Sequence, residues 1–189
     1  MIDKPMAYLI PGRDERLCGA LGSVLQQEGQ AVRGRALRGD FLRLRFPDQL
    51  AAVGADLEAE FWHPEALLVG RSYGAYILLH TLAERRPFPG RVLLFSPVLG
   101  IGARPDGRFG FRPPRATRLR EMAREGTLPL PRCLEIHTGA GDEGCDPALA
   151  EEIFSDAPGV TLAIVPKMGH ELDPAYVWRV VRRFLGERG

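Results

Sequence analysis

The sequence Ala66-Leu67-Leu68-Val69-Gly70-Arg71-Ser72-Tyr73-Gly74-Ala75-Tyr76-Ile77 decides the fold. Apolar residues run into the pattern Gly-Arg-Ser-Tyr-Gly, and an apolar, helix-favouring run follows it. A short segment that is apolar on both faces and ends at a glycine is typical of a buried parallel strand. A G-x-S-x-G pattern between a strand and a helix indicates a sharp turn that holds the serine above the edge of the sheet. The stretch therefore predicts a buried strand, a turn at Ser72 and a helix.

The two glycines of this turn have a steric explanation. A serine in a strained backbone conformation crowds the residues two before and two after it, and Gly70 and Gly74 remove the Cβ atoms that would clash. A helix that begins at Ser72 also directs its free N–H groups, and the positive end of its dipole, toward any negative charge that forms at the serine. The arrangement favours a nucleophilic Ser72 if the rest of the chain supplies a base and an acid.

The overall composition is that of an ordinary globular protein. Of the 189 residues, 45% are hydrophobic and 26% are charged, and the net charge is +1. We therefore expect one domain spanning residues 1–189, with neither nucleic acid nor a membrane as its partner. Its apolar runs are too short to span a bilayer, and its N-terminus lacks the features of a signal peptide. The three cysteines show no C-x-x-C spacing, which argues against disulfides or structural zinc and favours a cytoplasmic location.

Further short apolar runs predict the other strands. They lie at 6–10, 91–96, 134–138 and 160–165, and an arginine-containing run at 31–37 suits an edge strand. Apolar residues at helical spacing predict helices at 15–27, 47–61, 75–85, 146–156 and 175–187. Strands that alternate with helices imply right-handed crossovers. We therefore predict an α/β fold, a three-layer, open, mostly parallel sheet of about six strands with helices on both faces.

One segment, residues 100–132, departs from this alternation. It is rich in arginine, proline and glycine, and its one candidate helix lies at 115–125. Long connections of this kind are often solvated loops. The segment is therefore expected to be either a basic, Pro/Gly-rich connection or a small lid that forms one wall of a substrate site.

The positions of an acid and a histidine complete a catalytic pattern. A serine becomes a strong nucleophile when a histidine takes its proton and a carboxylate orients that histidine. In folds of this kind the chain order is nucleophile, acid, histidine. Asp142 follows the strand at 134–138, and His170 follows the last strand. Because the carboxyl ends of parallel strands meet at one edge of a sheet, both are expected beside Ser72.

The competing residues fit other roles better. His63 precedes the central strand at the opposite edge, His80 lies too far along the helix that follows Ser72, and His137 lies inside a strand, where a core imidazole is expected. Among the acids, Glu143 is expected in solvent. Asp146 stands before a proline and looks like the N-cap of a helix.

An acyl-transfer site also needs hydrogen-bond donors for the developing oxyanion. One donor is expected from the backbone N–H of Tyr73, the residue after the nucleophile. The second is expected from the loop after the first strand, where the N–H of Arg13 is placed to donate and Gly12 allows close approach of the backbone.

These residues together resemble the α/β-hydrolase superfamily. The resemblance rests on Gly70-Arg-Ser72-Tyr-Gly74, on Gly139-Ala-Gly-Asp142 and on Gly169-His170, and it covers nearly the whole chain. It implies a Ser–His–Asp hydrolase whose serine forms an acyl-enzyme that water then cleaves, with no metal and no organic cofactor. The chain looks like the small members without a cap, many of which are esterases or thioesterases.

Several functional alternatives remain open at this stage. The expected activity is cleavage of an ester or thioester of a small acyl group, a small-molecule substrate. The same triad also fits an acyltransferase, an amidase or a peptidase, and the scaffold also fits a catalytically silent binding module. Arg71 and Arg13 flank the expected site, so a substrate with a carboxylate or phosphate would suit it. The alternative role for Arg71 is a structural ion pair behind the turn.

Overall fold

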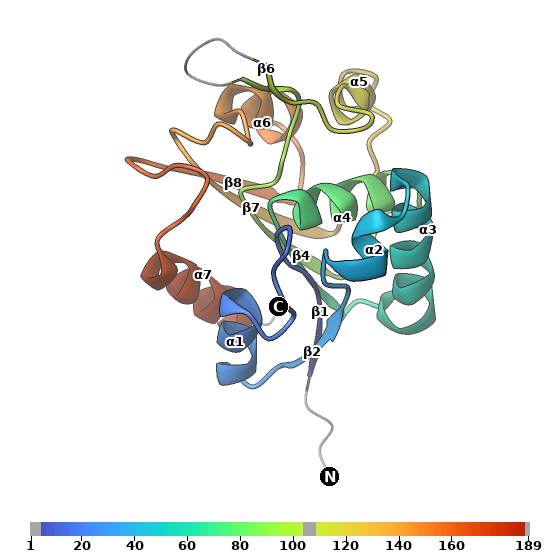
Figure 1. Cartoon of the computed structure of the whole chain (residues 1–189), viewed down its shortest axis with the longest axis vertical. Helices are drawn as coiled ribbons and strands as arrows, with labels where there is room; N and C mark the ends of the chain where they lie inside the picture. Colours follow the sequence, from blue (N-terminus) through green and yellow to red (C-terminus); the bar gives the residue numbers. More distant parts are fainter. Residues whose placement is uncertain (1–4, 104–108, 188–189) are drawn as a thin grey trace.

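The core of the fold is a six-stranded parallel sheet (Figure 1). The computed structural model describes residues 5–103 and 109–187. The strands follow the order β2-β1-β3-β4-β7-β8 across the sheet. Their bounds are β1 (Met6–Ile10), β2 (Ala31–Gly34), β3 (Leu67–Arg71), β4 (Arg91–Phe95), β7 (Cys133–Gly139) and β8 (Val160–Val165). The predicted α/β class, the parallel sheet and the edge position of the arginine-containing strand are confirmed.

Helices cover both faces of this sheet. One face carries α1 (Ala20–Gln27) and α7 (Pro174–Gly186), which pack against each other. The other face carries α2 (Gly39–Arg43), α3 (Phe46–Asp56), α4 (Tyr73–Ala83), α5 (Arg118–Arg124) and α6 (Pro147–Phe154). In the described part of the chain, no helix is long and apolar enough to cross a membrane.

The two-residue period of β3 distributes its side chains between these layers. Leu68 belongs to the core beneath α3 and α4, whereas Leu67 and Val69 belong to the core beneath α1 and α7. Burying a side chain of this size stabilises the fold by about 1.5–3 kcal/mol. All residues of α4 are buried. The turn that presents Ser72 therefore lies between a largely buried strand and a fully buried helix.

Two helical boundaries differ from the prediction. The helix predicted at 15–27 begins only at Ala20, because the residues before it form a loop with turns at 12–15 and 16–19. A parallel bridge joins Arg13 to Leu37, and the backbone N–H of Asp14 donates to the carbonyl of Leu37. Asp14 itself has a φ of 65°, so it is a turn residue, and the N-cap of α1 is Gly19.

The region predicted as one helix at 47–61 also has a different form. It consists of α3 followed by a single π-helical stretch, η1 (Leu57–Phe61). The short helix α2 was not predicted, since five residues with no buried side chain give no apolar period. By contrast, the Asp146 cap is confirmed, because its side chain accepts a hydrogen bond from the N–H of Ala148 at the start of α6.

Most of the segment 100–132 has defined structure. Strands β5 (Gly102–Ala103) and β6 (Phe109–Phe111) pair antiparallel, and α5 follows them. The Tyr76 hydroxyl donates to the carbonyl of Pro114, and the N–H of Leu99, immediately before the segment, donates to the carbonyl of Gly144. These contacts tie the segment to α4 and to the loop that carries Asp142. Arg104 and Arg108, two of the arginines in this segment, lie outside the described residues.

A buried polar cluster fastens α7 to the sheet. On β7, Glu135 and His137 point to the same face, and His137 Nε2 donates to Glu135 Oε1 at 2.5 Å. Glu135 also pairs with Arg183, and His137 Nδ1 lies 2.7 Å from the hydroxyl of Tyr176, both on α7. Burial raises the pKa of Glu135, but the hydrogen bonds from His137 and Arg183 outweigh it and leave the pKa below its usual value. His137 is thus the core imidazole predicted from the sequence.

We expect Glu135→Ala to lower the free energy of unfolding by about 3 kcal/mol, because it leaves buried polar partners unpaired. Urea denaturation followed by circular dichroism measures this change. Glu187→Ala is the matched control: Glu187 pairs with Arg183 at the exposed end of α7, so its loss is expected to cost less than about 0.5 kcal/mol. Equal effects of the two substitutions would contradict the role given to Glu135.

Candidate active site

The turn between β3 and α4 holds Ser72 in an unusual backbone conformation. Its φ and ψ are 52° and −125°, a region that costs a non-glycine residue about 1–3 kcal/mol. The predicted glycines are required here. A Cβ on Gly70 would lie 2.8 Å from the Cα of Ala75, and one on Gly74 would lie 2.2 Å from the carbonyl oxygen of Ile10. The turn therefore has the strained geometry that the sequence predicts.

The structure brings Ser72, His170 and Asp142 together in one hydrogen-bonded chain. Ser72 Oγ lies 2.8 Å from His170 Nε2, and His170 Nδ1 lies 2.8 Å from Asp142 Oδ1. The three side chains come from three different strand ends, β3, β8 and β7, at one edge of the sheet. A serine hydroxyl in this position can pass its proton to the imidazole, and the carboxylate fixes the imidazole's tautomer.

Asp142 is held by more than its contact with His170. Its Oδ1 also accepts from the N–H groups of Gly144 and Cys145 at 2.8 and 2.9 Å, and its Oδ2 accepts from the hydroxyl of Thr138 at 2.9 Å. Burial raises the pKa of Asp142, yet its hydrogen bonds to His170 and Cys145 hold the pKa below its usual value. Asp142 is therefore a buried carboxylate in a fixed orientation.

His170 has the electrostatic setting of a base. Its hydrogen bond to Asp142 raises the pKa of His170 above its ordinary value of 6.5, and this effect outweighs burial, which lowers it. Since the neutral imidazole is the form that accepts the serine proton, the active form is lost as the pH falls below this raised pKa.

We expect kcat/KM of the free enzyme to rise with pH through an apparent pKa above 6.5, because that rise reports deprotonation of His170. The measurement is a pH–rate profile with an ester that is stable across the range. In Asp142→Asn the carboxylate charge is absent, so the apparent pKa is expected to fall. A profile that does not respond to this substitution would assign the titration to another group.

The two expected oxyanion donors, Tyr73 and Arg13, belong to segments whose backbones approach each other closely at Gly74 and Pro11. A Cβ on Gly74 would lie 2.3 Å from the carbonyl oxygen of Pro11, so the loop after β1 starts against the first turn of α4. Among the described residues, the N–H groups of Tyr73 and Arg13 have no hydrogen-bond partner. The N–H of Gly12 differs, because it donates to Glu15 Oε2 at 3.2 Å.

Arg71 lies in the structural ion pair that the sequence left as an alternative. Its guanidinium binds Glu15 at 2.9 Å and also pairs with Glu171. Arg13 instead lies over the ring of Tyr73, with its guanidinium carbon 5.6 Å from the ring centroid. A role for Arg71 in binding an anionic substrate stays a prediction.

The sequence did not point to Thr138, Glu15 or Glu171 as parts of the site. Thr138 could have been suspected from its place at the end of the strand before Asp142. The two glutamates gave no signal, since their contacts join segments far apart in the chain. Cys145 is a buried thiol whose pKa burial raises to about 12. Among residues 5–103 and 109–187, no group of three His, Cys, Asp or Glu side chains is arranged to hold a metal ion.

Comparisons with known proteins identify the class of fold. No protein-family model and no curated protein sequence matches the chain. Solved structures do match it. A predicted CIB-like hydrolase from Thermoplasma acidophilum is 15% identical with a TM-score of 0.69, over 97% of this chain and 87% of that one.

Two further structures give the same result. Alpha/beta hydrolase domain-containing protein 10 from mouse is 13% identical with a TM-score of 0.67, over 97% of this chain and 88% of that one. A monoacylglycerol lipase from Paleococcus ferrophilus is 14% identical with a TM-score of 0.67, over 96% and 95%. The chain therefore has the α/β-hydrolase fold, as its sequence motifs predict.

Proposed function

We propose that the protein is a serine hydrolase that cleaves an ester or thioester of a small acyl group through an acyl-enzyme. The observation that carries this proposal is the hydrogen-bonded chain from Ser72 through His170 to Asp142. A core histidine or a surface serine would not need a third, buried carboxylate aligned behind it. Similarity of fold to a predicted hydrolase and a monoacylglycerol lipase adds support as analogy.

In the proposed acylation, Ser72 Oγ attacks the substrate carbonyl carbon while its proton passes to His170 Nε2. The carbonyl oxygen becomes an oxyanion, which the N–H groups of Tyr73 and Arg13 stabilise. The tetrahedral intermediate then collapses. The bond to the leaving group breaks, and His170 returns the proton to the leaving oxygen or sulfur.

In deacylation a water molecule takes the place of the leaving group. His170 accepts a proton from this water, which attacks the acyl carbon, and then protonates Ser72 Oγ as the carboxylic acid departs. Asp142 remains ionised throughout and stabilises the imidazolium that forms twice in each cycle. The lowered pKa of Asp142 supports this role.

The segment 100–132 is a candidate wall for the acyl group. The Phe111 ring lies 6.1 Å from the Tyr73 ring in an edge-to-face arrangement, and Phe111 is 40% exposed. Ile101, in the same segment, is 47% exposed. An exposed aromatic ring beside the proposed oxyanion donor, and an exposed aliphatic side chain in the same segment, favour a short apolar acyl chain over a charged one.

The same triad fits an acyltransferase, an amidase or a peptidase, so the leaving group and acceptor must be tested. A panel of butyrate esters, a butyryl thioester and a butyranilide holds the acyl group constant. The esters and the thioester form the same butyryl-enzyme, so they share one deacylation step. We expect the anilide to be cleaved at least about 100-fold more slowly than either. Preferential cleavage of the anilide, or transfer to added alcohols in place of hydrolysis, would favour the alternatives. Absence of all turnover in folded protein would favour a silent scaffold.

A further inference from the structure

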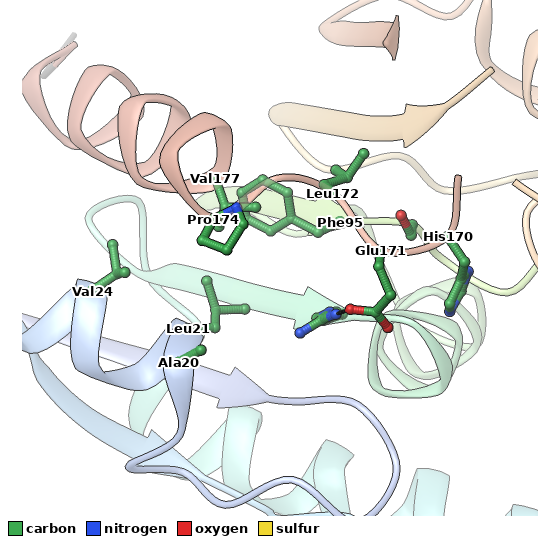
Figure 2. Close-up of a pocket in the computed structure, with 11 residues that line it drawn as sticks. Ala20, Leu21, Val24, Phe95, His170, Glu171, Leu172, Pro174 and Val177 are labelled. Carbon is green, nitrogen blue, oxygen red and sulfur yellow. Dashed lines mark hydrogen bonds and ion pairs between the residues drawn. The ribbon is translucent and has the colours of Figure 1, made fainter. Parts of the chain in front are cut away.

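A cavity lies between α1 and α7, on the opposite face of the sheet from α4. Its volume is about 240 Å³. The far end is lined by aliphatic side chains of both helices, including Leu21, Val24 and Val177, and Figure 2 shows His170 and Glu171 at the other end. The cavity is thus apolar along α1 and α7 and polar at the end next to the catalytic base.

Residues that are bonded to Ser72 line the cavity and place it next to this serine. Arg71 precedes Ser72 in the chain, and the carbonyl of Phe95 accepts a hydrogen bond from the Ser72 N–H at 2.9 Å. Both Arg71 and Phe95 line the cavity, as does His170. Neither Tyr73 nor Arg13 does, although both lie in the described part of the chain. The cavity therefore lies on the side of the base, away from the proposed oxyanion donors.

The position of the cavity beside His170 indicates which half of an ester substrate it would hold. The carbonyl oxygen must face the N–H groups of Tyr73 and Arg13, and the leaving atom must face His170 Nε2 to receive its proton. The acyl group takes the remaining direction, toward the exposed apolar side chains of the segment 100–132. A group that extends past His170 into this cavity is consequently the alcohol or thiol that leaves.

The lining also restricts the chemistry of that group. Arg71 is paired with Glu171, which also lines the cavity, and with Glu15, which does not, so its positive charge is neutralised. The cavity therefore offers no free positive charge to an anionic leaving group. Ser96 also lines the cavity; it is 1% exposed, and its hydroxyl has no hydrogen-bond partner among the described residues. Because an unpartnered buried hydroxyl is unfavourable, a ligand oxygen that reached it would gain a hydrogen bond.

We propose that this cavity binds the leaving-group half of the substrate, a neutral and mainly apolar alcohol or thiol of roughly six to eight carbons. The size follows from comparison with engineered cavities, where about 150 Å³ is enough for benzene. This inference rests on the proposed function, and it makes the leaving group, not the acyl group, the part of the substrate that is selected by length.

Two ester series test it. One keeps the butyryl group and lengthens the alcohol from methanol to octanol, and the other keeps 4-nitrophenol and lengthens the acyl chain. In the wild type, kcat/KM is expected to rise about threefold to fourfold for each methylene of the alcohol that the cavity buries. Ala20→Phe and Val177→Phe narrow the cavity from its two sides and are expected to abolish this rise. They should leave the dependence on acyl length unchanged.

Ala175→Phe is the matched control, because Ala175 is an exposed residue of α7 that does not line the cavity. It is expected to behave as the wild type in both series. If cavity-filling variants that keep the wild-type circular dichroism retain the alcohol dependence, or lose the acyl dependence instead, the inference is wrong. Labelling of each protein with a small ethyl fluorophosphonate separates this failure from failure of the proposed function, since an unlabelled wild type would overturn both.

Discussion

Asp142→Ala is expected to lower kcat about 10⁴-fold, while Asp142→Asn is expected to lower it only about 100-fold. The difference arises from the way this carboxylate is held. Asp142 Oδ1 accepts hydrogen bonds from His170 and from the N–H groups of Gly144 and Cys145. An asparagine would keep its carbonyl oxygen at this position. In the flipped orientation its amino group would face the two backbone N–H donors, which is unfavourable.

In Asp142→Asn, therefore, the imidazole keeps its orientation and its tautomer but loses the charge that stabilises the imidazolium. Charge-assisted hydrogen bonds exceed neutral ones by about 1–2 kcal/mol, with a further contribution from the lost Coulomb attraction. In Asp142→Ala the orientation is lost as well. The measurement is single-turnover acylation with a chromogenic ester. Equal losses in both variants would contradict this account, because the orientation and tautomer that asparagine keeps would then contribute nothing beyond the charge.

Gly74→Ala is expected to damage both stability and activity, although Gly74 lies outside the triad. A Cβ at this position would lie 2.2 and 2.3 Å from the carbonyl oxygens of Ile10 and Pro11. Both are backbone atoms, one at the end of a central strand, so neither can move as a side chain would. We expect the free energy of unfolding to fall by at least about 3 kcal/mol.

Any folded Gly74→Ala protein is also expected to lose activity, since the displaced loop carries Arg13. Urea denaturation and ester hydrolysis measure the two effects. Gly186→Ala in α7 is the control, because a Cβ there would meet no atom within 4 Å. A stable and active Gly74→Ala variant would contradict both the packing at the turn and the proposed place of the oxyanion donor.

The sequence predicts much of this structure because its central signals are local. The strand before Gly70, the turn at Ser72 and the capped helix after Asp146 each depend on neighbouring residues, and all three are found. The edge at which Asp142 and His170 meet follows from topology, since parallel strands end on the same side. The core position of His137 was predicted from its place inside a buried strand.

The features that the sequence missed depend on contacts between distant segments. The late start of α1 follows from the bridge between Arg13 and Leu37. The ion pairs of Arg71 join segments 56 and 100 residues apart. The cavity between α1 and α7 needs two helices from opposite ends of the chain. Local propensity cannot reveal such pairings.

The central claim is that Ser72 is an activated nucleophile, and labelling with a fluorophosphonate, followed by intact-mass analysis and peptide mapping, tests it most directly. The account predicts one adduct per chain, on Ser72, which is absent from both Ser72→Ala and His170→Ala. An unlabelled wild-type protein with native circular dichroism, or an adduct that persists in Ser72→Ala, would contradict it.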